Sequence, residues 1–173
     1  MGTRTRTRPD ESRKPGQITA EGYRALQEEA GRLWAVDRPQ VTEGVATAAA
    51  EGDRSENAEY TYGKMKLAAI DRKLRFLGNR LDVLTVVSEP APDDGRVHFG
   101  CWVELEAEEG TRRRYRIVGA DETNIERGHI SADSPMAKAL LGRERDEEVL
   151  VKRPKGDAHY LITEIFVVDP DAA

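Results

Sequence analysis

Between residues 67 and 84, leucine or isoleucine recurs in alternating steps of three and four residues. This spacing is the a/d pattern of a heptad repeat, which keeps one apolar stripe of a helix facing a partner helix. The pattern predicts a helix of about 28 residues, roughly 42 Å long at 1.5 Å per residue. The positions of this seam are Leu67, Ile70, Leu74, Leu77, Leu81 and Leu84.

A second helical pattern precedes the first, and Thr19 is a candidate N-cap for it. Pro39 lacks a backbone N–H, so we expect a kink or short break near Asp37–Arg38. Gly52 is a natural stop for this helix. Because the connection is short, residues 18–88 are predicted to form an antiparallel coiled-coil hairpin. The apolar positions of this first arm are Tyr23, Leu26, Ala30, Leu33, Val41, Val45 and Ala48.

Beyond residue 96 the pattern changes to short alternating stretches, which are typical of β-strands. Residues 89–96 are rich in Pro, Asp and Gly and are predicted to be a linker. Ser134 and Pro135 suit the N-cap and first position of a short helix. The fold class is therefore α+β, with a small antiparallel sheet crossed by one short helix in residues 97–173. The expected strands and helix are Val97–Glu106, Arg112–Val118, Met136–Leu141 (the helix), Val149–Lys152 and Tyr160–Val168.

Composition supports a two-part chain. Of the 173 residues, only 6% are aromatic while 34% are charged, so one large core is not expected. Residues 1–88 carry a net charge of +2 and residues 89–173 a net charge of −7, which suggests different roles for the two halves. Residues 1–17 have almost no hydrophobic side chains and are predicted to be a disordered arm, either a solvated tail or a contact for nucleic acid.

Cysteine content and apolar runs limit the possible locations of the chain. Cys101 is the only cysteine, so an intramolecular disulfide is impossible. No apolar run approaches the roughly 20 residues of a membrane span, and the N-terminus has no apolar signal region. A cytoplasmic protein with no membrane association is the expectation.

The segment Gly52–Tyr60, GDRSENAEY, lies at the turn of the predicted hairpin. In one interpretation Asp53 is the N-cap of the second helix and Glu56 reaches back to its start. In the other, the Asp53 and Glu56 carboxylates together bind one Mg²⁺ weakly, leaving most of its coordination to other ligands. Such a site would work only where a second molecule supplied those ligands.

The second predicted helix carries six basic residues between Lys64 and Asp82. They either form a solvated face with some i,i+4 ion pairs or an electrostatic track for a nucleic-acid backbone. The six are Lys64, Lys66, Arg72, Lys73, Arg75 and Arg80.

GDRSENAEY after a Pro-interrupted helix resembles the tip motif of the bacterial Gre transcript-cleavage factors. The similarity covers residues 18–168 in order, and Trp34 and Arg54 are more typical of the GreB branch than of the GreA branch. Further matching segments are RPQV (residues 38–41), DRKLRFL (71–77), VHFGCWVELE (97–106), RYRIVGADE (114–122) and ISADSPMAKALLG (130–142).

The resemblance implies a mechanism for the acidic tip. The hairpin would enter the secondary channel of a backtracked RNA polymerase, near the extruded 3′ end of the nascent RNA. Asp53 and Glu56 match the family's acidic pair, which helps to hold a second Mg²⁺ in the polymerase active centre. Ser55 and Asn57 match the residues that orient the tip. The residues that would face RNA or the channel walls are Arg72, Lys73, Arg75 and Arg80.

The C-terminal half resembles the FKBP-like domain with which the family docks on the polymerase. Asp133, Ser134 and Pro135 match the docking segment, although a plain helix cap explains Ser134 and Pro135 equally well. The main departure from the family lies near Asp146, where most relatives have Gly-Asp and this chain has no glycine. His98, His129 and His159 lack ligand-like spacing and are interpreted as surface or packing residues.

Three functions compete at this stage. The first is a factor that stimulates RNA cleavage by the polymerase, is not itself an enzyme and carries no cofactor of its own. The second is an inhibitor that blocks the same channel, a class of relatives that carries a different tip. The third is a free-standing FKBP-like isomerase, which the few aromatic residues beyond residue 88 disfavour. A monomer is expected, because the hairpin satisfies its own seam.

Overall fold

The computed structural model describes residues 11–50, 57–87, 91–154 and 156–170. The chain divides into two compact units, each with its own packing. Unit 1 comprises Met1–Pro15 and Tyr23–Leu84, and unit 2 comprises Gly16–Gly22 and Thr85–Ala173. Within the described ranges, no helix is both long and apolar enough to cross a membrane.

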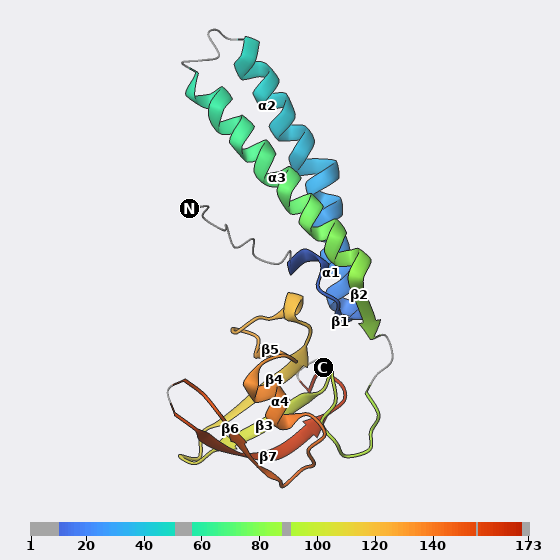
Figure 1. Ribbon diagram of the computed structural model, residues 1–173, viewed down its shortest axis with the longest axis vertical. Helices are drawn as coiled ribbons and strands as arrows, with labels where there is room; N and C mark the ends of the chain where they lie inside the picture. Colours follow the sequence, from blue (N-terminus) through green and yellow to red (C-terminus); the bar gives the residue numbers. More distant parts are fainter. Residues whose placement is uncertain (1–10, 51–56, 88–90, 155, 171–173) are drawn as a thin grey trace, which may run out of the picture. The chain divides into compact units, whose positions relative to one another are not determined.

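Unit 1 is a helical hairpin (Figure 1). Its first arm consists of α1 (Ala20–Arg32), the π-helix η2 (Leu33–Asp37) and α2 (Arg38–Ala50), and its second arm is α3 (Ala58–Val83). The break predicted near Asp37–Arg38 is confirmed as the π-helix. The Arg38 N–H bonds to the Leu33 carbonyl five residues earlier, because Pro39 removes the next i→i−4 donor and its ring crowds the preceding turn.

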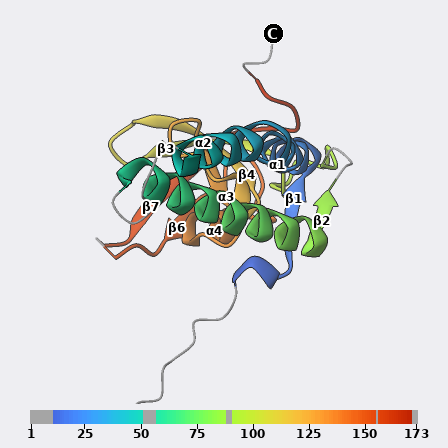
Figure 2. The same ribbon diagram turned by 90° about the horizontal axis from the view of Figure 1, so that it is seen from above.

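The two arms pack antiparallel along the predicted seam, as Figures 1 and 2 show. Arg38 pairs with Asp71 (2.8 Å), Val45 faces Gly63 and Ala48 accepts a hydrogen bond from Asn57, so numbering rises on one arm as it falls on the other. A Cβ on Gly63 would lie 2.7 Å from Val45 Cγ2, which shows how closely the helices approach there. The seam positions of α3 and Leu84 are all buried or half-buried.

The N-terminal segment contacts the C-terminal end of α3. The 3₁₀-helix η1 (Glu11–Arg13) buries Ser12, whose Oγ accepts a hydrogen bond from Asn79 Nδ2 at 3.1 Å. Arg80 donates to the Lys14 carbonyl. The predicted disordered arm is therefore wrong for residues 11–17, because polar groups rather than apolar ones order this segment; residues 1–10 lie outside the described residues.

Unit 2 is built on a five-stranded sheet of order β5-β4-β3-β7-β6. The α+β fold class is confirmed, but the sheet is mixed rather than antiparallel, because β5 pairs parallel to β4. The first strand starts at Trp102 rather than at Val97, after a turn in which Gly100 has φ +90°. The strands are β3 (Trp102–Ala107), β4 (Arg112–Val118), β5 (His129–Ser131), β6 (Glu148–Val151) and β7 (Ala158–Phe166).

The core of unit 2 lies between this sheet and α4 (Pro135–Leu140). Val103, Leu105, Ile117 and Ile162 from the three central strands are at most 1% exposed. Ala137 and Leu140 of α4 complete the core. The predicted helix start is confirmed: Ser134 Oγ accepts from the Ala137 N–H (3.1 Å), and Pro135 is the first helical residue.

A second, two-stranded sheet was not predicted. It pairs β1 (Gly16–Thr19) with β2 (Leu84–Val87), both of which the sequence placed outside any sheet. Thr19 caps α1 as expected, since its Oγ1 accepts from the Gly22 N–H at 3.0 Å. The Glu122 carboxylate, in the 3₁₀-helix η3 (Ala120–Glu122), accepts from the Thr19 and Gly119 N–H groups, both at 2.9 Å. The second sheet is thus anchored to the main one.

Candidate functional site at the hairpin tip

The acidic pair Asp53 and Glu56, together with Ser55, lies in residues 51–56, outside the described residues. Their assignment as metal-binding and tip-orienting residues stays a prediction. The structure does decide where α3 begins. Its first residue is Ala58 and its N-cap is Asn57. The interpretation of Asp53 as the N-cap of this helix is therefore wrong, and Glu56 precedes the helix rather than lying in its first turn.

Asn57 joins the two arms where the hairpin turns. Its Oδ1 accepts a hydrogen bond from the Tyr60 N–H at 3.1 Å, which is the N-cap bond of α3. Its Nδ2 donates to the carbonyl oxygen of Ala48 at 2.8 Å, near the end of α2. One amide thus satisfies a free N–H of one helix and a free C=O of the other. Ala48 is itself buried, so this contact between the two arms lies in the packed part of the hairpin.

Most of the predicted basic face of α3 is exposed. Lys73 pairs with Glu29 at 3.3 Å, with its ammonium 6.0 Å from the Phe76 ring centre. Neither Arg72 nor Arg75 has an ion-pair partner among the described residues, and both side chains are exposed. Arg80 differs from the rest: it is 6% exposed and bonds to the Lys14 carbonyl. The prediction that Arg80 faces RNA or the channel walls is therefore wrong, because its side chain is buried and bonded to the Lys14 carbonyl.

The hairpin also exposes large apolar side chains, of which the sequence singled out only Trp34. Tyr62 and Met65 on α3 are 66% and 60% exposed, and Trp34 in the π-helix is 66% exposed. The Arg38 guanidinium lies 5.7 Å from the Trp34 ring centre. Tyr62 borders a groove of about 710 Å³ between the two arms. Trp34 stood out in the sequence because it is one of the two residues more typical of the GreB branch than of the GreA branch.

The predicted docking segment has two exposed members. Asp133 and Pro135 are exposed, whereas Ser134 is half-buried and caps α4. The Asp133 N–H donates to Ser131 Oγ at 3.1 Å, and the Ser134 N–H donates to the Ser131 carbonyl at 2.9 Å. These bonds fix the turn that presents Asp133 and Pro135 to solvent.

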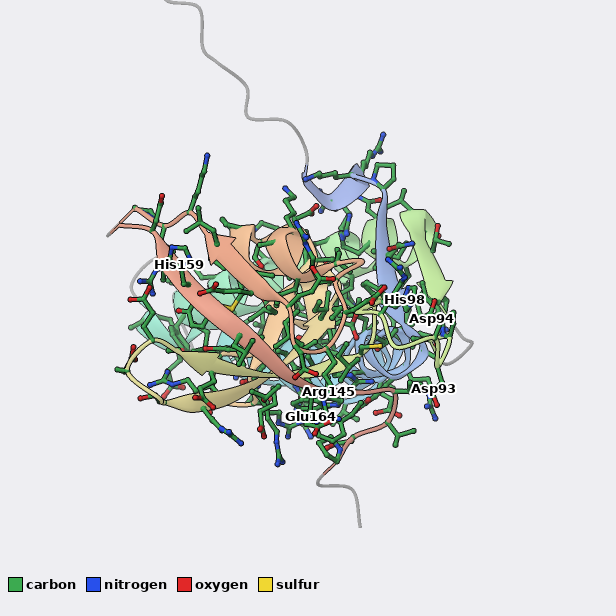
Figure 3. The ribbon with its side chains drawn as sticks, turned by 90° about the horizontal axis from the view of Figure 1, so that it is seen from below. Asp93, Asp94, His98, Arg145, His159 and Glu164 are labelled. Carbon is green, nitrogen blue, oxygen red and sulfur yellow. The ribbon has the colours of Figure 1, made fainter. Side chains whose placement is uncertain are left out.

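The histidines do not form a metal site. His98 lies beside Asp94 (2.8 Å) and His159 lies in another part of unit 2, as Figure 3 shows. The His98 hydrogen bond lowers the pKa of Asp94. His129 packs edge-on against Trp102 with ring centres 5.5 Å apart, and burial lowers its pKa. Across the described residues, no group of three His, Cys, Asp or Glu side chains is arranged to hold a metal ion.

Comparison with known proteins covers both units. Residues 17–86 match the family model described as "Transcription elongation factor, N-terminal", and residues 91–166 match "Transcription elongation factor, GreA/GreB, C-term". The chain is 52% identical over 161 residues to the transcription elongation factor GreB of Pseudomonas aeruginosa, covering 93% of this chain and 96% of that protein. It is 50% identical over 152 residues to GreB of Yersinia pestis, covering 88% of this chain and 89% of that one.

Solved structures are more distant. The transcription factor Gfh1 is 24% identical with a TM-score of 0.44, covering 88% of this chain and 97% of that one. A GreA/GreB factor from Nitrosomonas europaea is 17% identical with a TM-score of 0.39, covering 87% of this chain and 98% of that one.

Proposed function

Because this chain belongs to the GreA/GreB family of transcription elongation factors, we propose that it binds RNA polymerase and stimulates cleavage of backtracked RNA. The hairpin tip enters the secondary channel and reaches the extruded 3′ end of the nascent RNA. Hydrolysis belongs to the polymerase, and the chain contributes ligands and positioning but no nuclease activity of its own. It acts as a monomer in the cytoplasm, where its partner transcribes.

The observation that supports this proposal most directly is the double hydrogen bond of Asn57. It makes Asn57 the N-cap of α3 and ties the start of α3 to Ala48 of α2, so α3 does not need Asp53 or Glu56 as its cap. Carboxylates that are not needed to cap α3 can serve another molecule. Preorganising them lowers the entropic cost of bringing ligands to a reaction centre.

The donor chemistry of the tip fits Mg²⁺, which prefers carboxylate oxygens and keeps most of its coordination for water and phosphate. Asp53 and Glu56 would hold the ion jointly with groups of the polymerase, and Ser55 and Asn57 would orient them. When bound, the ion supplies charge neutralisation and an acidified water for phosphodiester hydrolysis. With only two carboxylates, the tip alone should bind the ion weakly.

The rest of the hairpin suits a channel with protein walls and RNA inside it. Arg72, Lys73 and Arg75 supply exposed positive charge for RNA or acidic walls. Trp34 and Tyr62 supply exposed aromatic surface for protein contact. In unit 2, Asp133 and Pro135 are exposed on a fixed turn and suit docking on the polymerase surface.

The deciding experiment measures RNA cleavage in a purified backtracked RNA polymerase complex with Mg²⁺, with and without this protein. We expect the protein to accelerate release of 3′ RNA fragments. Asp53→Asn and Glu56→Gln should abolish this effect without weakening polymerase binding. The matched control is Glu59→Gln, because Glu59 is an exposed carboxylate in the first turn of α3 and should be dispensable.

Three results would contradict parts of the proposal. Binding without acceleration would make the chain a channel-blocking inhibitor. Parental activity in Asp53→Asn or Glu56→Gln would remove that residue from the ligand set. RNA cleavage by the protein without polymerase would show that it is itself a nuclease.

A further inference from the structure

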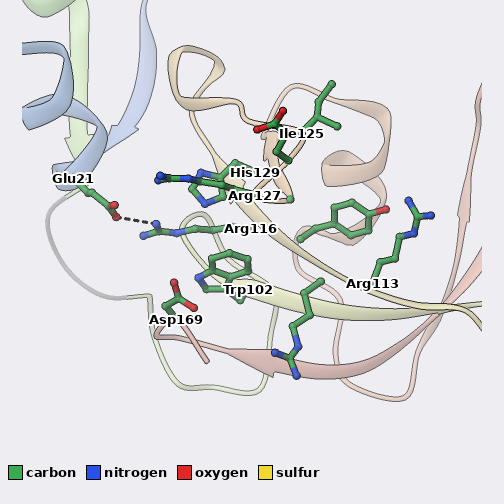
Figure 4. Close-up of a pocket in the computed structure, with 12 residues that line it drawn as sticks. Glu21, Trp102, Arg113, Arg116, Ile125, Arg127, His129 and Asp169 are labelled. Carbon is green, nitrogen blue, oxygen red and sulfur yellow. Dashed lines mark hydrogen bonds and ion pairs between the residues drawn. The ribbon is translucent and has the colours of Figure 1, made fainter. Parts of the chain in front are cut away.

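Unit 2 contains a cavity that none of the roles above uses (Figure 4). It has a volume of about 670 Å³ and lies beside β4. The turn between Asn124 and His129 borders it on one side, and Trp102 and Asp169 line it as well. All of its lining residues belong to unit 2, so the cavity is a property of that unit alone.

A rigid turn presents an isoleucine at the rim of this cavity. Ile125 is 97% exposed, the most exposed large hydrophobic side chain among the described residues. The turn is closed by four hydrogen bonds. Arg127 N–H donates to Asn124 Oδ1 (3.1 Å) and Gly128 N–H to the Ile125 carbonyl (3.2 Å), while Asn124 and His129 each donate an N–H to the other's carbonyl (3.1 and 2.8 Å). An apolar side chain held in water on an ordered turn is a preformed anchor for a protein contact.

The cavity lining has a small net positive charge, because its four arginines outnumber its three carboxylates, Glu21, Glu126 and Asp169. Arg116 is paired with Glu21 at 2.9 Å and Arg114 with Glu104 at 3.0 Å. Arg113 and Arg127 have no ion-pair partner within the described residues, and both are exposed. These two cations lie on the half of the chain that carries a net charge of −7, so they form a local exception to its acidity.

The cavity also contains an unused hydrogen-bond donor. Trp102 is 8% exposed, and its indole Nε1–H meets no acceptor among the described residues. The Arg116 guanidinium lies 6.0 Å from the ring centre, and Figure 4 shows the indole beneath it in the cavity. A buried N–H without an acceptor is unfavourable, because it has lost its hydrogen bonds to water. A carboxylate entering beside Arg116 would supply that acceptor.

We infer that the Ile125 turn and this cavity form a docking surface for an acidic protein segment of RNA polymerase that also carries an aliphatic side chain. The carboxylate meets Trp102 and the arginines, and the aliphatic group packs on Ile125. Isoleucine, tryptophan and arginine around one hollow form a typical centre of a protein interface. A nucleic-acid backbone fits less well, because it has no aliphatic side chain to pack on the exposed Ile125.

This inference rests on the proposed function, and its test separates the two. Affinity for RNA polymerase core enzyme and cleavage in backtracked complexes are measured for the parent, Ile125→Asp and Arg127→Glu. The matched controls are Leu150→Asp and Lys152→Glu, which change exposed residues in or just after β6, at the opposite edge of the sheet from β5. We expect Ile125→Asp to weaken binding at least tenfold. Arg127→Glu should weaken it several-fold and flatten its salt dependence, while both controls bind like the parent.

A photo-crosslinker at position 125 identifies the partner. Crosslinks to an acidic segment of a polymerase subunit support the inference, whereas crosslinks to RNA or DNA overturn it in favour of nucleic acid. Parental affinity in both Ile125→Asp and Arg127→Glu overturns it while leaving the proposed function intact. Conversely, the parent could bind polymerase without stimulating cleavage, while both variants lose binding. That result supports the docking surface and refutes the cleavage function. Failure of the parent to bind polymerase overturns both.

Discussion

Replacing Asn57 by alanine removes both hydrogen bonds that join the arms of the hairpin at its tip. Loss of the N-cap bond to the Tyr60 N–H costs about 1 kcal/mol. Loss of the bond to the Ala48 carbonyl costs about 1 kcal/mol more. Together, about 2 kcal/mol corresponds to a rise of about 30-fold in local opening of the tip, at 1.4 kcal/mol per tenfold change.

Asn57→Asp is the matched variant, because it keeps the acceptor for the Tyr60 N–H and removes only the donor to Ala48. The expected rise in opening is about fivefold, from the loss of one hydrogen bond of about 1 kcal/mol. Part of this cost is offset, because a carboxylate at a helix N-terminus interacts favourably with the helix dipole.

Amide hydrogen exchange of Tyr60 measures the opening directly, with the amide of Leu77 in the seam as an internal reference. Exchange at Tyr60 should be fastest in Asn57→Ala and intermediate in Asn57→Asp, with Leu77 unchanged in both. Stimulation of RNA cleavage should decrease in the same order, because the acidic pair is then held less firmly. Unchanged Tyr60 protection in Asn57→Ala would refute the structural reasoning. Loss of protection with full cleavage activity would refute the link between tip order and function.

Other perturbations test the fold and its pH dependence. A Cβ at Gly119 would lie 2.2 Å from the Gln17 carbonyl oxygen, so Gly119→Ala should lower the free energy of unfolding by about 2 kcal/mol in urea denaturation. Asp146 has φ +65°, so Asp146→Gly should raise the free energy of unfolding by about 0.5–1 kcal/mol; a decrease would show that its conformation carries no strain. Burial lowers the pKa of His129, so its contribution to stability is fully present above the unfolded pKa of about 6.5 and is lost as pH falls towards its lower folded pKa. The free energy of unfolding, measured by denaturation between pH 7 and 5, should fall less steeply with decreasing pH in His129→Gln than in the parent. His159→Gln, which changes an exposed histidine, is the control and should show the parental pH dependence.

Local patterns predicted the helices well because the signal for each lies within a few residues. The heptad seam of α3 depends only on spacing, and its positions are buried or half-buried as expected. Pro39 acts on its own turn, so the break before it was predictable even though its π-helical form was not. The Ser134 cap and Pro135 are likewise a local device, and both are confirmed. The missing glycine at Asp146 is explained by the same logic, since aspartate tolerates a positive φ better than most residues.

By itself, then, the sequence determined the hairpin, the α+β class and, through the tip motif, the resemblance to the Gre family. Only the tertiary structure decided which groups far apart in the chain meet. In the folded structure Asn57 caps α3, Arg80 is buried and bonded to the Lys14 carbonyl, β5 is parallel to β4, and Ile125 and Trp102 line one cavity. Periodicity reports which face of an element is buried but not which element it packs against. Pairing depends on hydrogen bonds and packing between distant segments, such as Arg80 and Lys14, 66 residues apart, or Thr19 and Glu122, 103 residues apart.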